Sequence, residues 1–498
     1  MSGITYLMMV LGIMLAKGLG FVRNIIFASE FGASELTDIY FQVFGIATFL
    51  FTCVGTALGT LVIKNLNKPE NALPSAQKQY VSGFICRISL IVIAVTALMF
   101  VGADAIIKWF LLPGLDAAFM PAARQMMYIM LPSGLFVIVA YIIAGVLQNC
   151  KTFFVTSVMS LPYNVIIIAS LIFKDFDIYT ISIITTIGWV LHVLILLPSF
   201  YKNGFRIFYR DKSLENSGAK EKSLEVLYIF ISSIMFHMCF VFDKAAVSHD
   251  SGVATTIYYA SNFFITIASI FVVAMSNVSF PGISKSFERG DKETVKKITQ
   301  QLIALLMAII VPFVLVAVVF GMDIMSVLYE RGEFTHELTA QTAVLFVIYT
   351  FGIFGYICQE LFNKLLYLDS KYKIPVIGSV VIMVAKPIIN CFVADFGVVP
   401  IALTTTALFT VYAAVIAIAI TKVTGNYATR EFGINILKIL IAGAAALGVW
   451  FVFYLTGFDP IGGRFGFVLP LAACGVTYVA VIVVSGLYKY LLPKRSES

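Results

Sequence analysis

The chain has 498 residues, of which 60% are hydrophobic and only 12% are charged, and its mean hydropathy is +0.96. A soluble protein carries roughly 25% charged residues, so this composition excludes a water-soluble enzyme, a disordered chain and a nucleic-acid-binding domain. The net charge of +7 arises from 34 basic and 27 acidic residues, and most basic residues lie in short connections between apolar runs. Such a distribution orients a protein in a membrane and gives no reason to expect a nucleic-acid partner.

Apolar stretches long enough to cross a bilayer follow one another along the whole chain. An α-helix needs about 20 apolar residues to span the hydrocarbon layer. We therefore predict an all-α polytopic membrane protein with about 14 transmembrane helices. The stretches lie near 5–29, 37–63, 80–103, 123–148, 153–173, 178–200, 224–248, 254–283, 298–321, 338–367, 374–394, 398–421, 435–456 and 465–490.

The positions of the cations predict the orientation. If the N-terminus is cytoplasmic and the spans alternate, the even-numbered connections and the C-terminal tail hold 25 of the 34 Lys and Arg residues. The odd-numbered connections hold 5, and the remaining 4 lie within or at the edge of spans. This positive-inside asymmetry predicts an even number of spans, with both termini cytoplasmic.

A weak internal repeat suggests how the spans are grouped. Arg23 and Lys244 each end the first span of a group, and Lys64 and Lys285 each close the second, at an offset near 221 residues. Transporters are often built from such repeats, so we predict two pseudo-symmetric six-helix lobes. The expected regions are an N-lobe at 1–203, a basic cytoplasmic linker at 204–222, a C-lobe at 223–422 and two extra helices with a basic tail at 423–498.

Charged residues inside the first two spans are candidate functional positions, because burying a charge in the membrane costs on the order of 3 kcal/mol. Lys17 and Arg23 lie six positions apart on one helix, so their directions differ by about 120°. They either line one wide cavity or extend toward an interface with their long side chains. Asp38 is either part of that cavity or the neighbour of a helix N-cap at Thr37.

The second half offers another set of interior polar residues. Asp243 precedes Lys244 near the end of the seventh span, and Lys386 lies next to a proline, four residues before Asn390. Lys386 and Asn390 should therefore share one helix face. A lysine this deep needs a carboxylate or water, and Asp243 and Glu360 are the candidate partners. The set is either a structural ion pair or a coupling and switch site.

The sequence lacks the motifs of common catalytic and nucleotide sites, including GxSxG, Walker A, HExxH and the Rossmann glycine pattern. We therefore expect a transporter and not an enzyme, without a cofactor or metal centre. The pair Gly55 and Gly59 matches a GxxxG motif, which favours close packing of helices.

Several segments resemble the MurJ/MviN family of lipid II flippases, within the multidrug/oligosaccharidyl-lipid/polysaccharide exporter superfamily. The first carries Ala16-Lys-Gly-Leu-Gly-Phe-Val-Arg23, followed by Phe31-Gly and Thr37-Asp38. Later segments with the same resemblance are Ile257-Tyr-Tyr-Ala, Pro281 to Gly290, Leu328-Tyr-Glu-Arg-Gly-Glu-Phe-Thr335, and Tyr367 before Pro375.

The resemblance implies two six-helix lobes around a cationic cavity, with alternating access moving an undecaprenyl-diphosphate-linked sugar unit from the inner to the outer leaflet. Lys17 and Arg23 occupy the family's cationic positions in the first helix, and Asp38 matches its second-helix acid. The last two helices would form a groove for the polyprenyl tail. A diphosphate that leaves water needs fixed cations, which Lys and Arg supply.

The chain also departs from the family pattern. Residues 45–57 lack the usual proline, arginines and Glu-Gly of the second helix. Ser261 and Asn262 replace an Asp-Arg pair of the eighth helix, so Asn262 is the candidate substrate contact there. Some relatives hold a monovalent cation near the positions of Asp243, Asn390 and Thr404. Lys386 intrudes on this region, which argues against a coupling cation.

The sequence thus predicts a lipid II flippase of peptidoglycan synthesis that acts as a monomer among membrane lipids. Three alternatives remain: a flippase for another polyprenyl-linked polysaccharide repeat unit, a drug exporter of the same superfamily, and a membrane-embedded glycosyltransferase or polymerase. The last would need a loop with clustered carboxylates, and the short connections disfavour it.

Overall fold

The computed structural model describes residues 3–66, 73–173, 176–211, 223–368, 371, 373–457 and 463–491. Across these residues the regular structure is helical, and β-type pairing is confined to one isolated bridge between Arg331 and Phe334. The prediction of an all-α fold is confirmed.

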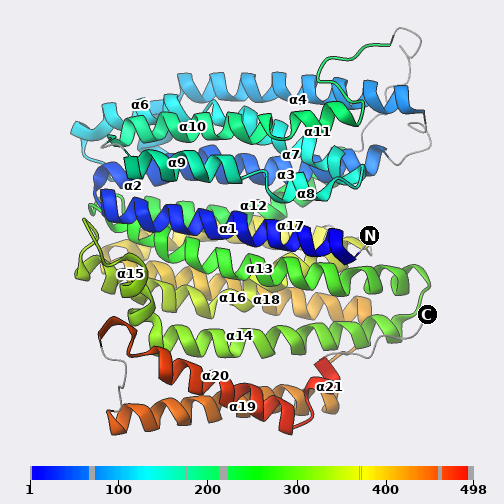
Figure 1. Cartoon of the computed structure of the whole chain (residues 1–498), viewed down its shortest axis with the longest axis vertical. Coiled ribbons are helices and arrows are strands. Elements are labelled where there is room, and N and C mark those ends of the chain that lie inside the picture. The colour runs from blue at the N-terminus through cyan, green and yellow to red at the C-terminus, as the bar shows by residue number, and fades with distance from the viewer. Residues whose placement is uncertain are drawn as a thin grey trace. The chain divides into compact units, whose positions relative to one another are not determined.

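Helices occupy all fourteen predicted stretches (Figure 1). Within the described ranges, ten segments are long and apolar enough to cross a membrane: Leu11–Phe31, Glu35–Ile63, Pro74–Val101, Ala117–Asn149, Phe153–Phe173, Ile178–Lys202, Lys292–Tyr329, Lys373–Phe396, Val398–Lys422 and Arg430–Thr456. The predicted polytopic architecture is confirmed.

The chain forms two compact units, one of residues 1–258 and 331–334 and the other of residues 259–330 and 335–498. The first contains α1 (Gly3–Phe31), α2 (Glu35–Phe44), the π-helical turn η1 (Gly45–Leu50), α3 (Phe51–Leu66), α4 (Pro74–Val101), α5 (Ala103–Ile106), η3 (Ile107–Leu111), η4 (Ala117–Phe119), α6 (Met120–Met130), α7 (Ser133–Asn149), α8 (Phe153–Ser157), α9 (Leu161–Phe173), α10 (Ile178–Leu194), α11 (Leu197–Lys202), α12 (Ser223–Ala246) and the first turns of α13 (Val253–Glu288).

The second unit takes the rest of α13 and all later helices. They are α14 (Lys292–Tyr329), α15 (His336–Phe351), α16 (Ile353–Leu368), α17 (Lys373–Val393), η6 (Ala394–Phe396), α18 (Val398–Thr424), α19 (Arg430–Thr456), η7 (Gly463–Phe465), α20 (Val468–Val484) and α21 (Tyr488–Leu491). The lobe boundaries predicted at 203 and 223 stay a prediction, and residues 212–222 of the linker lie outside the described residues.

Helices α3 and α7 of the first unit pack closely because glycines line their contact. A Cβ at Gly55 would lie 2.9 Å from the Cβ of Tyr141, and one at Gly59 would lie 2.8 Å from its carbonyl oxygen. Across the interface, a Cβ at Gly145 would meet the backbone of Gly59 at 2.6 Å. The predicted packing role of this glycine pair is confirmed.

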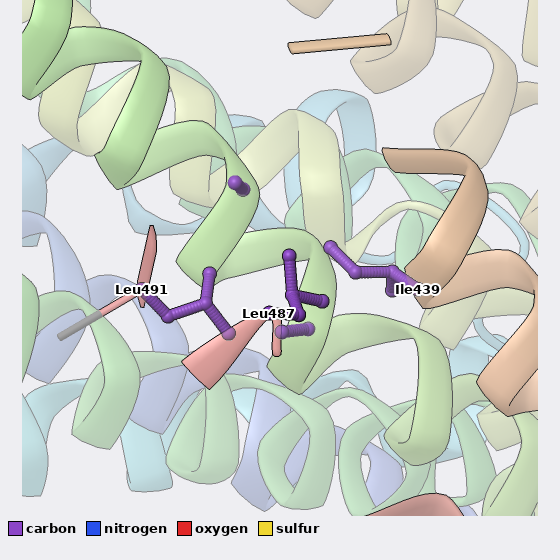
Figure 2. Packing of buried hydrophobic residues seen from close by; sticks show 5 residues of the cluster. Ile439, Leu487 and Leu491 are labelled. Atoms are coloured by element: carbon purple, nitrogen blue, oxygen red, sulfur yellow. The ribbon is translucent and has the colours of Figure 1, made fainter. Parts of the chain in front are cut away.

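In the second unit, α19, α20 and α21 are attached to α14 by small apolar contacts. Ala304 and Ala308 of α14 pack with Ile439 of α19 and with Leu487 and Leu491 at the C-terminal end (Figure 2). All five side chains are buried. This cluster holds the last helices at one end of α14, beside the pocket described below.

Candidate functional site

Arg23 lies on α1 in a half-buried setting of amides and aromatic rings. Its Nε and Nη2 donate to Oδ1 of Asn24 at 3.2 and 2.8 Å, and its Nη1 donates to Oδ1 of Asn164 on α9 at 3.3 Å. Its guanidinium carbon is 5.2 Å from the ring centroid of Tyr163 and 5.9 Å from that of Phe44. These amide oxygens and ring faces orient the planar guanidinium group.

Lys17 is also half-buried on α1, and Asn164 packs along the helix between the two cations. The Asn164 side chain donates to the carbonyl of Ala16 at 3.4 Å, and a Cβ at Gly20 would lie 3.6 Å from its oxygen. His237 of α12 lies within electrostatic range of Lys17. Lys17 and Arg23 thus lie on α1, which packs against α9. Their binding of substrate stays a prediction.

Asp38 on α2 is buried and accepts hydrogen bonds from the start of α13. Its carboxylate accepts from the backbone N–H of Gly252 at 2.7 Å, and from the N–H and the hydroxyl of Thr255, both at 2.6 Å. These N–H groups lie at the N-terminal end of α13, where backbone donors have no acceptor within the helix. Asp38 therefore caps a neighbouring helix across the interior of the first unit.

The alternative interpretation of Asp38 needs a correction. The N-cap of α2 is Ser34, and Thr37 is the third residue of the helix. The two form a capping box, in which each side-chain oxygen accepts a hydrogen bond from the other residue's backbone N–H. Thr37 is therefore not the N-cap, and Asp38 caps α13 and not its own helix. No local pattern indicates this contact, because the capped helix begins more than 200 residues later.

Lys244 of α12 lies near this cap and is buried. Its Nζ donates to the carbonyl of Phe41 at 3.1 Å and lies 6.0 Å from the ring centroid of Tyr258. A Cβ at Gly45 would lie 3.2 Å from Nζ, so the glycine at the start of the π-helical turn leaves room for the ammonium. Asp38 is within electrostatic range of Lys244, and together they place opposite charges beside the α2–η1 junction.

Lys386 of α17 is fully buried and donates to three neutral oxygens. Its Nζ lies 2.7 Å from Oδ1 of Asn390, 3.0 Å from the carbonyl of Ile401 and 2.6 Å from Oγ1 of Thr404. The Thr404 hydroxyl donates to the same Ile401 carbonyl at 2.7 Å, so its lone pairs face the ammonium. The structure thus brings together three predicted residues, and the predicted shared face of Lys386 and Asn390 is confirmed.

The remaining predicted residues are placed as follows. Asp243 is fully buried on α12 of the first unit, so its pairing with Lys386 of the second unit stays a prediction. Asn262 is half-buried on α13 in the second unit, and its contact with substrate also stays a prediction. The side chain of Glu360 lies outside the described residues.

A pocket of about 370 Å³ opens in the second unit between α14, α19 and α20. Apolar side chains line it almost throughout, among them Leu315, Trp450 and Leu471. Its volume falls within the range of roughly 300–1,000 Å³ that small-molecule sites occupy. An apolar pocket thus lies beside the last two helices, and its use as a groove for a polyprenyl tail stays a prediction.

A proline explains how α20 is attached at this pocket. Pro312 lies inside α14 and has no N–H, so the carbonyl four residues earlier, that of Ala308, loses its helical donor. The hydroxyl of Tyr478 on α20 donates to that carbonyl at 2.8 Å. The proline therefore leaves open the acceptor that ties α20 to α14.

Sequence reasoning missed the neutral side chains that orient the charged ones. Asn164 stands as a lone amide in an apolar run, and Asn24 directly follows Arg23. An isolated amide within a span is a detectable signal, because it needs a partner inside the membrane. Thr255 carries no such signal, since threonine is common in apolar helices.

Comparison with known proteins gives consistent relatives. The family model described as "Lipid II flippase MurJ" matches residues 27–461. A probable lipid II flippase MurJ from Buchnera aphidicola subsp. Schizaphis graminum is 22% identical over 390 residues, which cover 76% of this chain and 75% of the relative. The lipid II flippase MurJ of Burkholderia cenocepacia is 20% identical over 395 residues, covering 76% and 75%.

Solved structures share the fold. The chain is similar to a lipid II flippase MurJ in an inward closed conformation, with a TM-score of 0.77 and 21% identity over 97% of this chain and 99% of that one. An inward-facing multidrug transporter of the MATE family matches with a TM-score of 0.59 and 13% identity over 82% and 96%. The chain therefore shares the fold of these two transporters.

Proposed function

Because the chain belongs to the MurJ family of lipid II flippases, we propose that it moves lipid II, the undecaprenyl-diphosphate-linked precursor of peptidoglycan, from the inner to the outer leaflet by alternating access. The family and the apolar helices make the chain a multi-pass protein of the bacterial inner membrane. We further propose that it acts as a monomeric transporter without chemical catalysis, with both termini cytoplasmic.

The observation that carries this proposal is the setting of Arg23. A diphosphate that enters the membrane loses hydration, and a fixed cation in a low dielectric replaces part of it. The amide oxygens of Asn24 and Asn164 and the ring face of Tyr163 orient the Arg23 guanidinium for this role. Lys17, on the same helix, supplies a second cation beside a negatively charged headgroup.

The pocket beside α14 suits the other end of the substrate. A polyprenyl tail is apolar and flexible. In an apolar cavity the tail makes more close van der Waals contacts than it does among loosely packed lipid chains. The pocket lining contains two side chains with polar tips, Trp450 and Tyr478, and the Tyr478 hydroxyl already donates to Ala308. The proposal therefore assigns the headgroup to the first unit's cations and the tail to this pocket.

For the coupling site, we propose that Lys386 takes the place of a mobile cation. Its ammonium has three protons, and each has an oxygen acceptor within 3.0 Å. An amide oxygen, a carbonyl and a hydroxyl are the ligands that a sodium ion would also use. A cation tethered through α17 cannot exchange with solution, so the transport cycle should not depend on sodium.

A flippase for another polyprenyl-linked polysaccharide unit is the second candidate. Residues 45–57 lack the second-helix arginines of the family pattern, and residues 45–50 form a π-helical turn instead. Fewer cations would suit a headgroup with fewer negative charges. A drug exporter remains the third candidate in this fold class.

Complementation of a bacterium depleted of its own lipid II flippase tests the proposal. The wild-type chain should restore growth and cell shape, and Arg23→Ala at equal membrane level should not. A matched control is Arg87→Gln, since Arg87 is exposed on α4, and this variant should rescue fully. Failure of the wild-type chain, with rescue of a polysaccharide-export mutant instead, would favour the second candidate.

A further inference from the structure

A short extended segment follows α11 in a fixed direction. The helix ends in a Schellman motif, in which the N–H of Gly204 bonds the carbonyl of Tyr201 at 2.9 Å and the N–H of Phe205 bonds that of Phe200 at 3.2 Å. Gly204 has a φ of +80°, as this cap requires. The buried rings of Phe200 and Phe205 stack at 5.6 Å, so the exit direction of the chain is set.

Side chains of α4 hold the next residues in place. The Ser82 hydroxyl donates to the carbonyl of Ile207 at 2.8 Å and accepts from the N–H of Tyr209 at 2.7 Å. The side-chain oxygen of Gln79 accepts from the N–H of Asp211 at 2.8 Å. The backbone groups of Ile207, Tyr209 and Asp211 thus bond side chains of α4, as alternate residues of a β-strand bond a neighbouring strand.

The intervening residues face outward and form what we call the Arg206 stripe, consisting of Arg206, Phe208 and Arg210. All three are exposed, and the Phe208 side chain is 82% exposed. An aromatic ring between two guanidinium groups at alternate positions combines apolar and cationic character on one edge. In water such a ring is unfavourable, but at a membrane interface aromatic and basic side chains are both favoured.

The position of the stripe along α4 places it near lipid headgroups. Ser82 precedes Leu90 by eight residues, or about 12 Å along the helix. Leu90 and Ile91 are 67% and 57% exposed and begin the lipid-facing surface of α4. The segment also belongs to an even-numbered connection, on the side of the membrane that holds most cations.

We propose that the Arg206 stripe binds anionic phospholipid headgroups of the surrounding leaflet, with the guanidinium of Arg206 on phosphate and the Phe208 ring inserted among the acyl chains. Each basic residue near an anionic surface contributes roughly a fivefold preference for it. A soluble anion would satisfy the arginines but would leave Phe208 in water, so the ring selects a lipid. The anchored segment would fix the chain that leads into the second half against the membrane.

The test uses the full-length protein in nanodiscs with Phe208→Trp as a reporter. Subtracting the fluorescence of the wild-type chain isolates the new indole from the three native tryptophans. Brominated phosphatidylglycerol should quench this indole several-fold more than brominated phosphatidylethanolamine at equal content. Adding Arg206→Gln should reduce the preference by about fivefold.

Arg289→Gln serves as the control, because Arg289 is an exposed cation on the α13–α14 turn; it should leave the preference unchanged. Equal quenching by the two lipids, or an indole that reports water in both, would overturn the proposal. Loss of the preference on adding millimolar glycerol phosphate would also overturn it, since the site would then bind a free anion. None of these readouts requires transport, so they are independent of the flippase proposal.

Discussion

Arg23 and Lys386 are both cations inside helices of this membrane protein, yet their surroundings differ. Lys386 is fully buried, and its three protons point at three oxygens of α17 and α18. Arg23 is half-buried and lies against amides and aromatic faces. The Lys386 ammonium donates hydrogen bonds to three oxygens of the protein, whereas the planar Arg23 guanidinium lies at the edge of the packed interior.

The role of a cation in a span therefore depends on the acceptors around it and not on its position alone. A lysine with all donors used acts as a cross-link between helices and has none left for a ligand. An arginine that amide oxygens and ring faces orient presents a planar group of donors that suits a phosphate. The two sites should therefore respond differently to mutation: Lys386 through stability, Arg23 through transport.

The largest effect is expected at Lys386. In Lys386→Ala, the oxygens of Asn390 and Thr404 lose their donor inside the membrane, at roughly 1–3 kcal/mol for each. The variant should lose about 2–5 kcal/mol of stability in detergent and regain part of it in sodium chloride compared with choline chloride. Lys373→Ala, at the exposed start of the same helix, should change stability by less than about 0.5 kcal/mol. A sodium response in the wild-type chain would show that Lys386 does not occupy the cation's place.

The cap formed by Asp38 should give the next largest effect. Asp38→Ala leaves the N–H groups of Gly252 and Thr255 without their acceptor, and we expect a loss of about 2–4 kcal/mol. Asp38→Asn keeps one side-chain oxygen and should lose less. Thermal unfolding at equal detergent concentration measures both. If Asp38→Ala were as stable as the wild type but did not transport, Asp38 would belong to the substrate site.

Arg23→Ala should reduce lipid II transport by about 10- to 100-fold, as expected for loss of a charged hydrogen bond worth roughly 1.5–3 kcal/mol. Arg23→Lys should keep part of the activity, because it retains the charge without the planar donor pair. Unfolding temperature should fall less than in Lys386→Ala, because Arg23 is half-buried and water can replace its donors at the Asn24 and Asn164 oxygens. Normal transport with a large loss of stability would reverse the comparison and make Arg23 the structural cation.

The tail pocket should give a smaller effect. Gly475 lines the pocket and a Cβ there meets nothing within 4 Å, so we expect the ring of Gly475→Phe to occupy part of the pocket. We expect KM to rise several-fold for substrates with a long polyprenyl tail and to change little for short-tailed analogues. Val476→Phe places the same ring on the neighbouring residue, which is 71% exposed, and is the control. Equal effects of the two variants would argue against a tail site.

The smallest effect concerns an exposed helix cap that contrasts with Asp38. Asp177 caps α10, and hydrogen bonds from the hydroxyl and N–H of Thr180 lower the pKa of its carboxyl below the usual 3.8. The stability from this cap is therefore present above pH 3.8 and is lost as the pH falls through the lowered pKa. Asp177→Asn should remove this small step from the acid side of the stability profile. An unchanged profile would show that the cap contributes nothing measurable.

Much of the fold could be predicted because the membrane imposes a simple rule on each span. Long apolar runs must form helices to satisfy their backbone groups, and α14 and α18 follow directly from this rule. The face shared by Lys386 and Asn390 followed from helical spacing. These are local properties of the chain.

The contacts that define the site could not be predicted because they join distant segments. Asp38 caps a helix that begins at Val253, and Arg23 meets Asn164 on the ninth helix. Likewise, Tyr478 donates to the carbonyl that Pro312 leaves open. Packing selects such pairs among many similar polar residues, and spacing along the chain carries no information about the choice.

The decisive experiment is translocation of lipid II by the purified chain in proteoliposomes, with choline as the only monovalent cation. We expect the wild-type chain to expose the lipid II headgroup on the far leaflet as fast in choline as in sodium, and Arg23→Ala to be much slower in both. Transport that requires sodium, or that is unchanged in Arg23→Ala, would contradict this expectation.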